Sequence, residues 1–265
     1  MREDAAASGF KDHFSGSAVQ YAAFRPLYPA SLFAWLASQS PAHTLAWDCA
    51  TGNGQAAIGL AEYFSRVIAT DASAPQLAQA MPHPNIEYRV ADAIHSSLPD
   101  RSVDLVTVAQ AAHWLLLPAF YEEVCRVLKP GGLCVMWCYG VLTCEGDEVN
   151  QAVQAFCQHI APWWPPERVH VENGYRDLPF PFAREMPPPF EMSVNWHLSE
   201  LIGYLGSSSA ATRYRAEQGE DPMSALEARL LPLWGSAPRR ITWPLSVLAG
   251  RCVISAKPPC NASSR

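Results

Sequence analysis

The first half of the chain alternates short apolar runs with amphipathic segments, and this alternation restricts the possible folds more than any other feature. Strand-like runs lie at residues 44–50, 66–72, 86–92, 103–110 and 133–139. Continuous apolar strands separated by helices are typical of a parallel sheet that is covered on both faces. Because the crossovers of such sheets are right-handed, the sequence predicts a doubly wound α/β fold.

Composition and charge exclude several classes of protein. The 265 residues are 49% hydrophobic and carry a net charge of -6, with no concentration of Lys and Arg. Nucleic-acid binding and a polybasic membrane contact are therefore not expected. The N-terminus has no apolar signal segment, and no apolar run is long enough to span a bilayer, so we expect a cytoplasmic protein.

The eight cysteines and eight histidines show no metal-binding pattern. No CxxC pair is present, and Cys49, Cys134 and Cys138 fall in apolar strands. We expect the cysteines to be reduced and structural, as is typical of cytosolic proteins, and we expect no metal site.

A glycine-containing loop follows the first strand, where open α/β sheets bind ligands. Asp48 is followed by Ala50, Gly52 and Gly54 at alternate positions, and Asp71 ends the second strand. Glycines let the backbone approach a ligand, and a carboxylate such as Asp71 can accept hydrogen bonds from a ribose diol. A plain strand-to-helix turn with a surface aspartate would give the same loop pattern.

A nicotinamide cofactor is a second interpretation, because residues 52–57 also fit the pattern G-x-G-x-x-A. A pyrophosphate site does not favour a carboxylate at Asp48, whereas the ammonium group of a methionine moiety does. The loop alone leaves both cofactors open.

Six segments together resemble the class I S-adenosylmethionine-dependent methyltransferases, particularly the methyltransferase type 11 family and proteins similar to trans-aconitate methyltransferases. The segments are YAAFRPLYP (21–29), LAWDCATGNGQAA (45–57), VIATDAS (67–73), VADA (90–93), SVDLVTVAQAAHW (102–114) and RVLKPGG (126–132). The resemblance implies a Rossmann-like, mostly parallel seven-stranded sheet, with S-adenosyl-L-methionine as the cofactor.

The resemblance also implies roles for individual residues. Asp48 and the backbone of Ala50, Gly52 and Gly54 would hold the amino-acid part of the cofactor. The ribose and adenine would contact Asp71, Ala72, Asp92 and Ala93, Gln110 would line the methionine side, and Tyr21 and Arg25 would close the site. Ala50 departs from the family, which usually has glycine there. If this backbone needs a positive φ, the alanine costs about 1 kcal/mol or more.

Candidates for the acceptor side are less specific. His113 follows the fourth strand and could act as a base or contact the acceptor, or could simply hydrogen-bond the loop. Trp114, Trp163, Trp164 and Tyr175 are candidate walls of the acceptor pocket, although packing explains them equally well. Arg184 or Arg213 could bind an acidic acceptor, but an exposed arginine is the simpler interpretation.

The expected enzyme transfers a methyl group to an oxygen or nitrogen atom of a small molecule, with a carboxylic acid among the candidates, and is a monomer or homodimer. A non-catalytic cofactor-binding homologue and a nicotinamide oxidoreductase are the alternatives. We expect an N-terminal helical closure segment (1–40), a cofactor-binding core (41–140), a lid with the sixth strand (141–240), and a final strand and tail (241–265).

Overall fold

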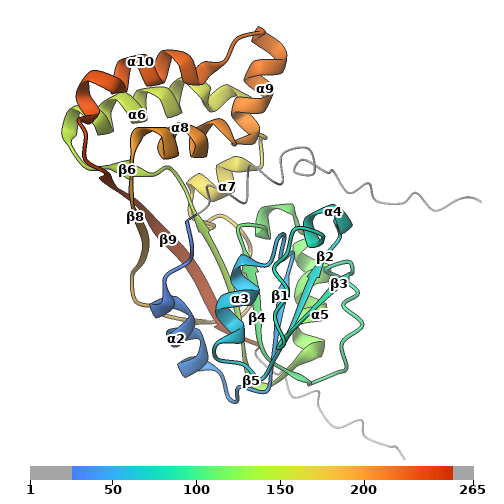
Figure 1. The fold of residues 1–265 in the computed structure, drawn as a ribbon. Coiled ribbons are helices and arrows are strands. Elements are labelled where there is room, and N and C mark those ends of the chain that lie inside the picture. The colour runs from blue at the N-terminus through green and yellow to red at the C-terminus, as the bar shows by residue number, and fades with distance from the viewer. Residues whose placement is uncertain (1–25, 253–265) are drawn as a thin grey trace, which may run out of the picture.

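The computed structural model describes residues 26–252, which form a single mixed sheet flanked by helices and topped by a helical cap (Figure 1). The main path of the sheet has the strand order β3-β2-β1-β4-β5-β9-β6, and β7 and β8 also pair with β9. The strands are β1 (Leu45–Cys49), β2 (Arg66–Asp71), β3 (Ile86–Val90), β4 (Val103–Ala109), β5 (Leu128–Tyr139), β6 (Thr143–Cys144), β7 (Ala183–Glu185), β8 (Phe190–Trp196) and β9 (Arg239–Arg251).

The strands β1 to β5 are parallel, and the four strands that pair along β9 are antiparallel to it. The order changes direction at β1, because the chain passes from β3 at one edge back to β4 on the other side of β1. The predicted doubly wound, mostly parallel sheet is therefore confirmed, but residues 26–252 form nine strands instead of the expected seven, because β7 and β8 also pair with β9. The carboxyl ends of β1 and β4 form the switch point at which open sheets bind ligands.

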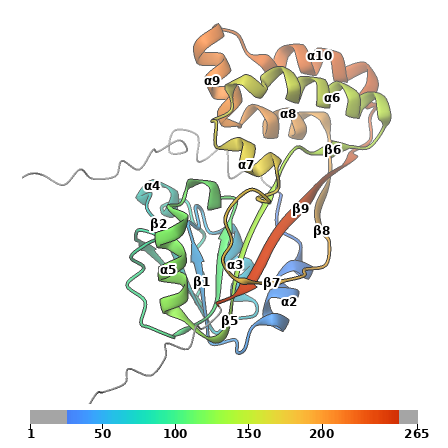
Figure 2. The ribbon, with the colours of Figure 1, turned by 180° about the vertical axis from the view of Figure 1, so that it is seen from behind.

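Helices cover both faces of the parallel strands. The flanking helices are α2 (Ala30–Gln39), α3 (Gln55–Ala61), α4 (Ala74–Leu77) and α5 (Leu117–Val127). Figure 1 shows α2 and α3 in front of the sheet, and Figure 2, from behind, shows α5 on the opposite face. The apolar face of α5 is buried, with Phe120, Val124 and Val127 at 0% exposure. Helix α2 packs in the same apolar cluster as α3, so this part of the predicted closure segment belongs to the core.

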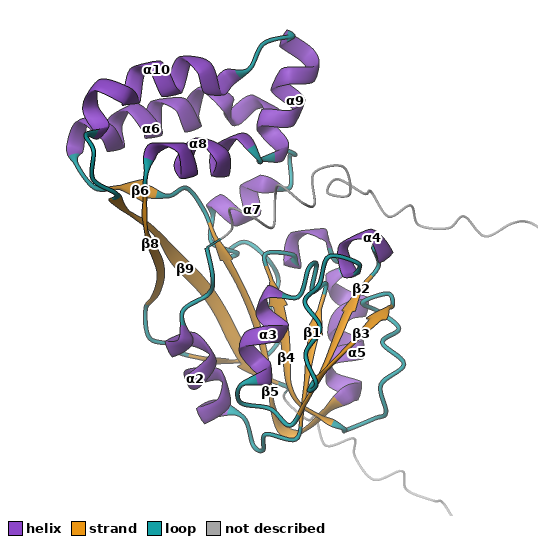
Figure 3. Ribbon diagram, in the orientation of Figure 1, coloured by secondary structure: helices purple, strands orange, loops and turns teal. Residues whose placement is uncertain are grey.

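The cap contains α6 (Asp147–Ile160), α8 (Leu198–Gly206), α9 (Ser209–Gln218) and α10 (Pro222–Trp234), with α7 (Arg168–Glu172) lying between the cap and the sheet (Figure 3). The cap has its own apolar cluster, which includes Phe156, Leu201, Leu230 and Trp243. Trp243 belongs to β9, so this strand is part of both the cap and the sheet.

Pro244 lies inside β9 at a position that tolerates proline. Its neighbours Ile241 and Thr242 pair with β6, and pairing with β5 begins at Leu245. Pro244 therefore falls in the gap between these two partners, where a missing N–H removes no ladder bond on that side.

The expectation that the cysteines are reduced is correct for some of them and wrong for two. Cys49, Cys134 and Cys138 are buried free thiols, as expected. Cys125 at the end of α5 instead forms a disulfide with Cys252, directly after β9. Sequence spacing could not suggest this pair, because 127 residues separate the two cysteines. Within residues 26–252, no helix is long and apolar enough to cross a membrane.

Candidate functional site

The loop between β1 and α3 is built from backbone in the left-handed region. The φ angles are 54° at Ala50, 59° at Gly52 and 84° at Gly54. A side chain at Gly54 would also collide with Tyr88, whose hydroxyl oxygen would lie 2.5 Å from the added Cβ. The positive φ that was suspected at Ala50 is thus present, and Ala50 adopts it despite its Cβ.

Asp48 lies beneath this loop and is 0% exposed. The hydroxyl of Thr51 donates to its Oδ2 at 2.5 Å, and the hydroxyl of Thr107 donates to its Oδ1 at 2.7 Å. Burial raises the pKa of Asp48 to about 6, although these two hydrogen bonds oppose the shift. The carboxylate therefore ties the loop to β4 and faces away from solvent, and a direct contact with a ligand stays a prediction.

Asp71 is positioned at the end of β2 by two backbone amides. The N–H of Gly52 donates to its Oδ2 and the N–H of Ser73 donates to its Oδ1, both at 2.8 Å. A carboxylate has about four acceptor positions, so it can hold these amides and a diol together. Ala72 is the residue between Asp71 and Ser73, and its predicted contact with the adenine stays a prediction. The structure brings Asp71 and the glycine loop together, as predicted.

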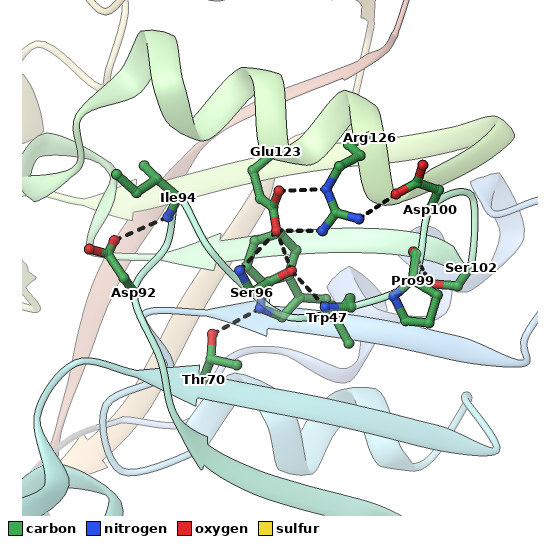
Figure 4. A network of polar contacts seen from close by, with 11 residues as sticks. Trp47, Thr70, Asp92, Ile94, Ser96, Pro99, Asp100, Ser102, Glu123 and Arg126 are labelled. Carbon is green, nitrogen blue, oxygen red and sulfur yellow. Dashed lines mark hydrogen bonds and ion pairs between the residues drawn. The ribbon is translucent and has the colours of Figure 1, made fainter.

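Asp92 and Ala93 lie on the loop after β3, and Glu123 fixes the position of that loop (Figure 4). Both the N–H and the hydroxyl of Ser96 donate to Glu123 Oε1, at 2.8 and 2.5 Å, and Arg126 forms ion pairs with Glu123 and Asp100. Burial alone would raise the pKa of Glu123, but the hydrogen bonds from Arg126 and Ser96 outweigh it and hold the pKa at about 2. The sequence analysis missed Glu123, because nothing in an amphipathic helix marks a glutamate that faces inward.

Gln110 and His113 follow β4 and reach a cavity beside the switch point. Gln110 has a φ of 57°, and its side-chain amide donates to the carbonyl of Tyr139 at 3.0 Å. His113 Nδ1 lies 3.0 Å from the hydroxyl of Tyr175, which is 0% exposed. Burial lowers the pKa of His113 to about 3, helped by the positive charge of Arg168. The imidazole is therefore neutral at physiological pH.

The cavity has a volume of about 130 Å³ and lies between the ends of β4 and β5 and the cap. Its walls include Gln110, His113, Trp114, Tyr139, Phe156, Trp164, Arg168, Glu172, Tyr204 and Ser208. Trp114 and Trp164 thus contribute to the walls. Trp163 packs on Tyr214 and donates to Glu217 instead, and Tyr175 lies behind His113.

Arg168 is the positively charged residue of the cavity wall, and it was not predicted from the sequence. Arg184 and Arg213, which were considered for an acidic acceptor, are not part of the cavity wall. A possible signal was the position of Arg168 four residues after Trp164, since the two side chains stack with 4.5 Å between Cζ and the ring centre. Tyr21 and Arg25, the predicted closing residues, lie outside the described residues.

The comparisons with known proteins place this geometry in a family. Residues 47–136, from β1 through the greater part of β5, match the family model of a methyltransferase domain. Two relatives, both named putative methyltransferases, match most of the chain. One from Dictyostelium discoideum is 33% identical over 84% of this chain and 86% of its own length. The chain belongs to the methyltransferases.

The second is a solved structure from Anaeromyxobacter dehalogenans, described as a type II methyltransferase. It is 44% identical, covers 86% of this chain and 98% of its own, and superposes with a TM-score of 0.82. An uncharacterized methyltransferase of Mycobacterium bovis is 37% identical, over 46% of this chain and 51% of its own length. The first two likenesses extend beyond the matched methyltransferase domain, since each covers more than four fifths of the chain.

Proposed function

We propose that the protein is an S-adenosyl-L-methionine-dependent methyltransferase that methylates an oxygen or nitrogen atom of a small molecule. The observation that carries the proposal is the hydrogen bond from the N–H of Gly52 to the carboxylate of Asp71, which links the loop after β1 to the end of β2. It places a carboxylate beside an open backbone at the switch point, and Gln110 and His113, which follow the adjacent strand β4, line the cavity.

The residues of the site fit this cofactor. A Cβ built on Gly52 would have no neighbour nearer than 4.0 Å, so the loop leaves space above its backbone. Asp71 would accept the ribose hydroxyls, Asp92 would accept from the adenine amino group, and Gln110 would line the methionine side. When bound, the cofactor supplies an electrophilic methyl group on a sulfonium sulfur. The protein then has to align the acceptor and exclude water, and the cap residues that line the cavity would contribute to both.

A small-molecule acceptor is favoured over a macromolecule. The cavity is lined by Phe156 and Tyr204 of the cap and by Trp164, and its volume is below the roughly 300 Å³ at which sites for drug-sized ligands begin. The net charge of -6 disfavours nucleic acid. The motif resemblance to trans-aconitate methyltransferases adds carboxylic acids to the candidate acceptors. A monomer or homodimer in the cytoplasm completes the proposal, although the Cys125–Cys252 disulfide counts against a reducing compartment.

Isothermal titration of the wild-type protein with S-adenosylhomocysteine and with NADH tests the cofactor. We expect S-adenosylhomocysteine to bind and NADH not to bind, and NADH binding alone would support the oxidoreductase alternative. Asp71→Ala should weaken S-adenosylhomocysteine binding by at least about tenfold, since it removes charge-assisted hydrogen bonds. Glu122→Ala on the exposed side of α5 is the matched control and should leave binding unchanged. Cofactor binding without methyl transfer to any acid, phenol or amine would favour a non-catalytic homologue.

A further inference from the structure

Arg168 brings a positive charge into a mainly apolar cavity and leaves a donor unused. Its side chain is 19% exposed, and its guanidinium stacks on Trp164 with 4.5 Å between Cζ and the ring centre. The Nε atom is buried and has no hydrogen-bond partner among the described residues. A buried donor without a partner costs about 1–3 kcal/mol, so this nitrogen favours a ligand that can accept from it.

Glu172 is the acidic group beside Arg168, and it does not satisfy this donor. The two residues are one helical turn apart on α7, with 3.9 Å between Nε and Oε1, which is beyond hydrogen-bond distance. The Glu172 side chain is 49% exposed and therefore remains hydrated. A partly exposed pair of this kind contributes little, so the Arg168 charge remains available to the cavity.

His113 also presents a donor to this cavity. The hydroxyl of Tyr175 lies 3.0 Å from His113 Nδ1, and burial raises the pKa of this phenol well above its ordinary value, so the phenol keeps its proton and donates it to His113 Nδ1. A neutral imidazole that accepts at Nδ1 carries its hydrogen on Nε2. We assign this tautomer from the hydrogen-bond network. His113 is thereby a hydrogen-bond donor on the cavity wall, since its lone pair is already used.

We propose that the methyl acceptor is a small organic acid whose carboxylate is held by Arg168, with His113 donating a second hydrogen bond. The inference rests on the proposed function, because it assigns the acceptor class of the same site. The fixed donor fork of a guanidinium matches a carboxylate, and stacking on Trp164 holds the plane of that fork. The cavity of about 130 Å³ limits the acid to a small one. Arg168 and His113 are anchoring residues, and neither removes a proton.

Paired acids and amides test the proposal in the protein saturated with S-adenosylhomocysteine. Benzoate and benzamide, phenylacetate and phenylacetamide, and butyrate and butyramide have similar shapes within each pair and differ in charge. Calorimetric titration should show at least one acid binding about tenfold or more tightly than its amide. In Arg168→Gln that preference should fall by roughly 10- to 100-fold, the range of one charge-assisted hydrogen bond. The same titrations with labelled S-adenosylmethionine then report transfer to the acid that binds.

The controls separate this proposal from the cofactor assignment. Arg184→Gln removes an exposed arginine on β7 outside the cavity wall, and acid binding should be unchanged. S-adenosylhomocysteine should bind equally to wild type and Arg168→Gln, and loss of binding in both would overturn the proposed function instead. If Arg168→Gln does not fold, Arg168→Met keeps the aliphatic stem over Trp164 without the charge. Equal binding of acid and amide, no acid binding to wild type, or unchanged acid binding in the uncharged variant would each overturn the proposal.

Discussion

The carboxylate of Asp71 accepts a hydrogen bond from the backbone N–H of Gly52 at 2.8 Å, so the end of β2 fixes the loop that follows β1. The same side chain that was expected to bind a ribose therefore also holds the loop in shape. Changes in this loop should consequently affect stability and cofactor affinity together.

Ala50→Gly should raise the free energy of unfolding by up to about 1 kcal/mol, because glycine removes the cost of a Cβ at φ 54° while adding some entropy to the unfolded chain. Urea unfolding measures the change. Ala56→Gly, within α3, is the matched control and should lower stability by about 1 kcal/mol. Equal effects at the two positions would show that the loop is not strained at Ala50.

Asp48 should make the protein less stable as the pH rises from about 4 to about 6. Its pKa is about 6 in the folded protein, chiefly through burial, against 3.8 for an ordinary aspartate. In this window the folded state holds a proton that the unfolded state has lost, so increasing pH favours unfolding. The difference in urea stability between wild type and Asp48→Asn should therefore change across pH 4–6 and level off above it. A pH-independent difference would contradict the assigned shift.

His113 should remain neutral throughout the range in which most enzymes work. Its pKa is lowered to about 3, first by burial and then by the charge of Arg168. Because the pKa of His113 is lower in the folded protein than in the unfolded chain, the unfolded state binds a proton first as the pH falls. The contribution of His113 to stability is therefore complete above pH 6.5 and is lost as the pH falls from about 6.5 towards 3. In NMR titrations, the His113 ring signal, identified by its loss in His113→Gln, should not shift between pH 5 and 8. An inflection near 6.5 would restore His113 as a candidate base.

Glu123→Gln should destabilise the protein by about 1–3 kcal/mol, since it leaves the buried Ser96 and the partly exposed Arg126 with a weaker partner. Hydrogen exchange should increase most over residues 92–102. The carboxylate stabilises the fold above its unfolded pKa, and this contribution should disappear as the pH falls from about 4.5 to about 2. Glu122→Gln is the adjacent exposed control, and a loss of similar size there would show that the network contributes little.

Cys125→Ser should lower the free energy of unfolding by about 2–4 kcal/mol, because the disulfide closes a long loop in the unfolded chain. Chemical unfolding with and without dithiothreitol measures this. The reductant should remove the difference between the variant and wild type. Cys157→Ser, which changes a free thiol and keeps the disulfide, is the control, and its difference in stability from wild type should be the same with and without reductant.

The parallel half of the fold was predictable because its signals are local. Apolar runs of five to seven residues, a helix face of Phe120 and Val124, and glycines at turns each follow from short-range chemistry. The motif around Lys129 was found by resemblance, and the structure gives its reason: Lys129 pairs with Asp104, which is 0% exposed, at 2.7 Å. Asp71 and the glycine loop also meet as expected, since the carboxyl ends of neighbouring parallel strands share one edge.

The acceptor side was not predictable, because its residues meet through long-range packing. His113 and Tyr175 lie 62 positions apart and come together through the segment that follows α7. That segment is rich in proline, so it offers no periodicity from which its path could be inferred. Nothing in the sequence distinguished Arg168 from the other arginines, because its stacking on Trp164 is visible only in the structure. The disulfide has the same origin, in two distant segments that the sheet brings together.

The strand β9 pairs with β5, β6, β7 and β8, although it is the last strand of residues 26–252. During synthesis, the edge of β5 that pairs with β9 therefore stays unpaired until more than a hundred further residues have left the ribosome. Contacts of such long sequence separation slow folding and leave unpaired edges exposed meanwhile. We expect the cap and the sheet to become stable in one late step, when β9 is inserted. Chaperone demand in the cell should consequently be set by this final strand.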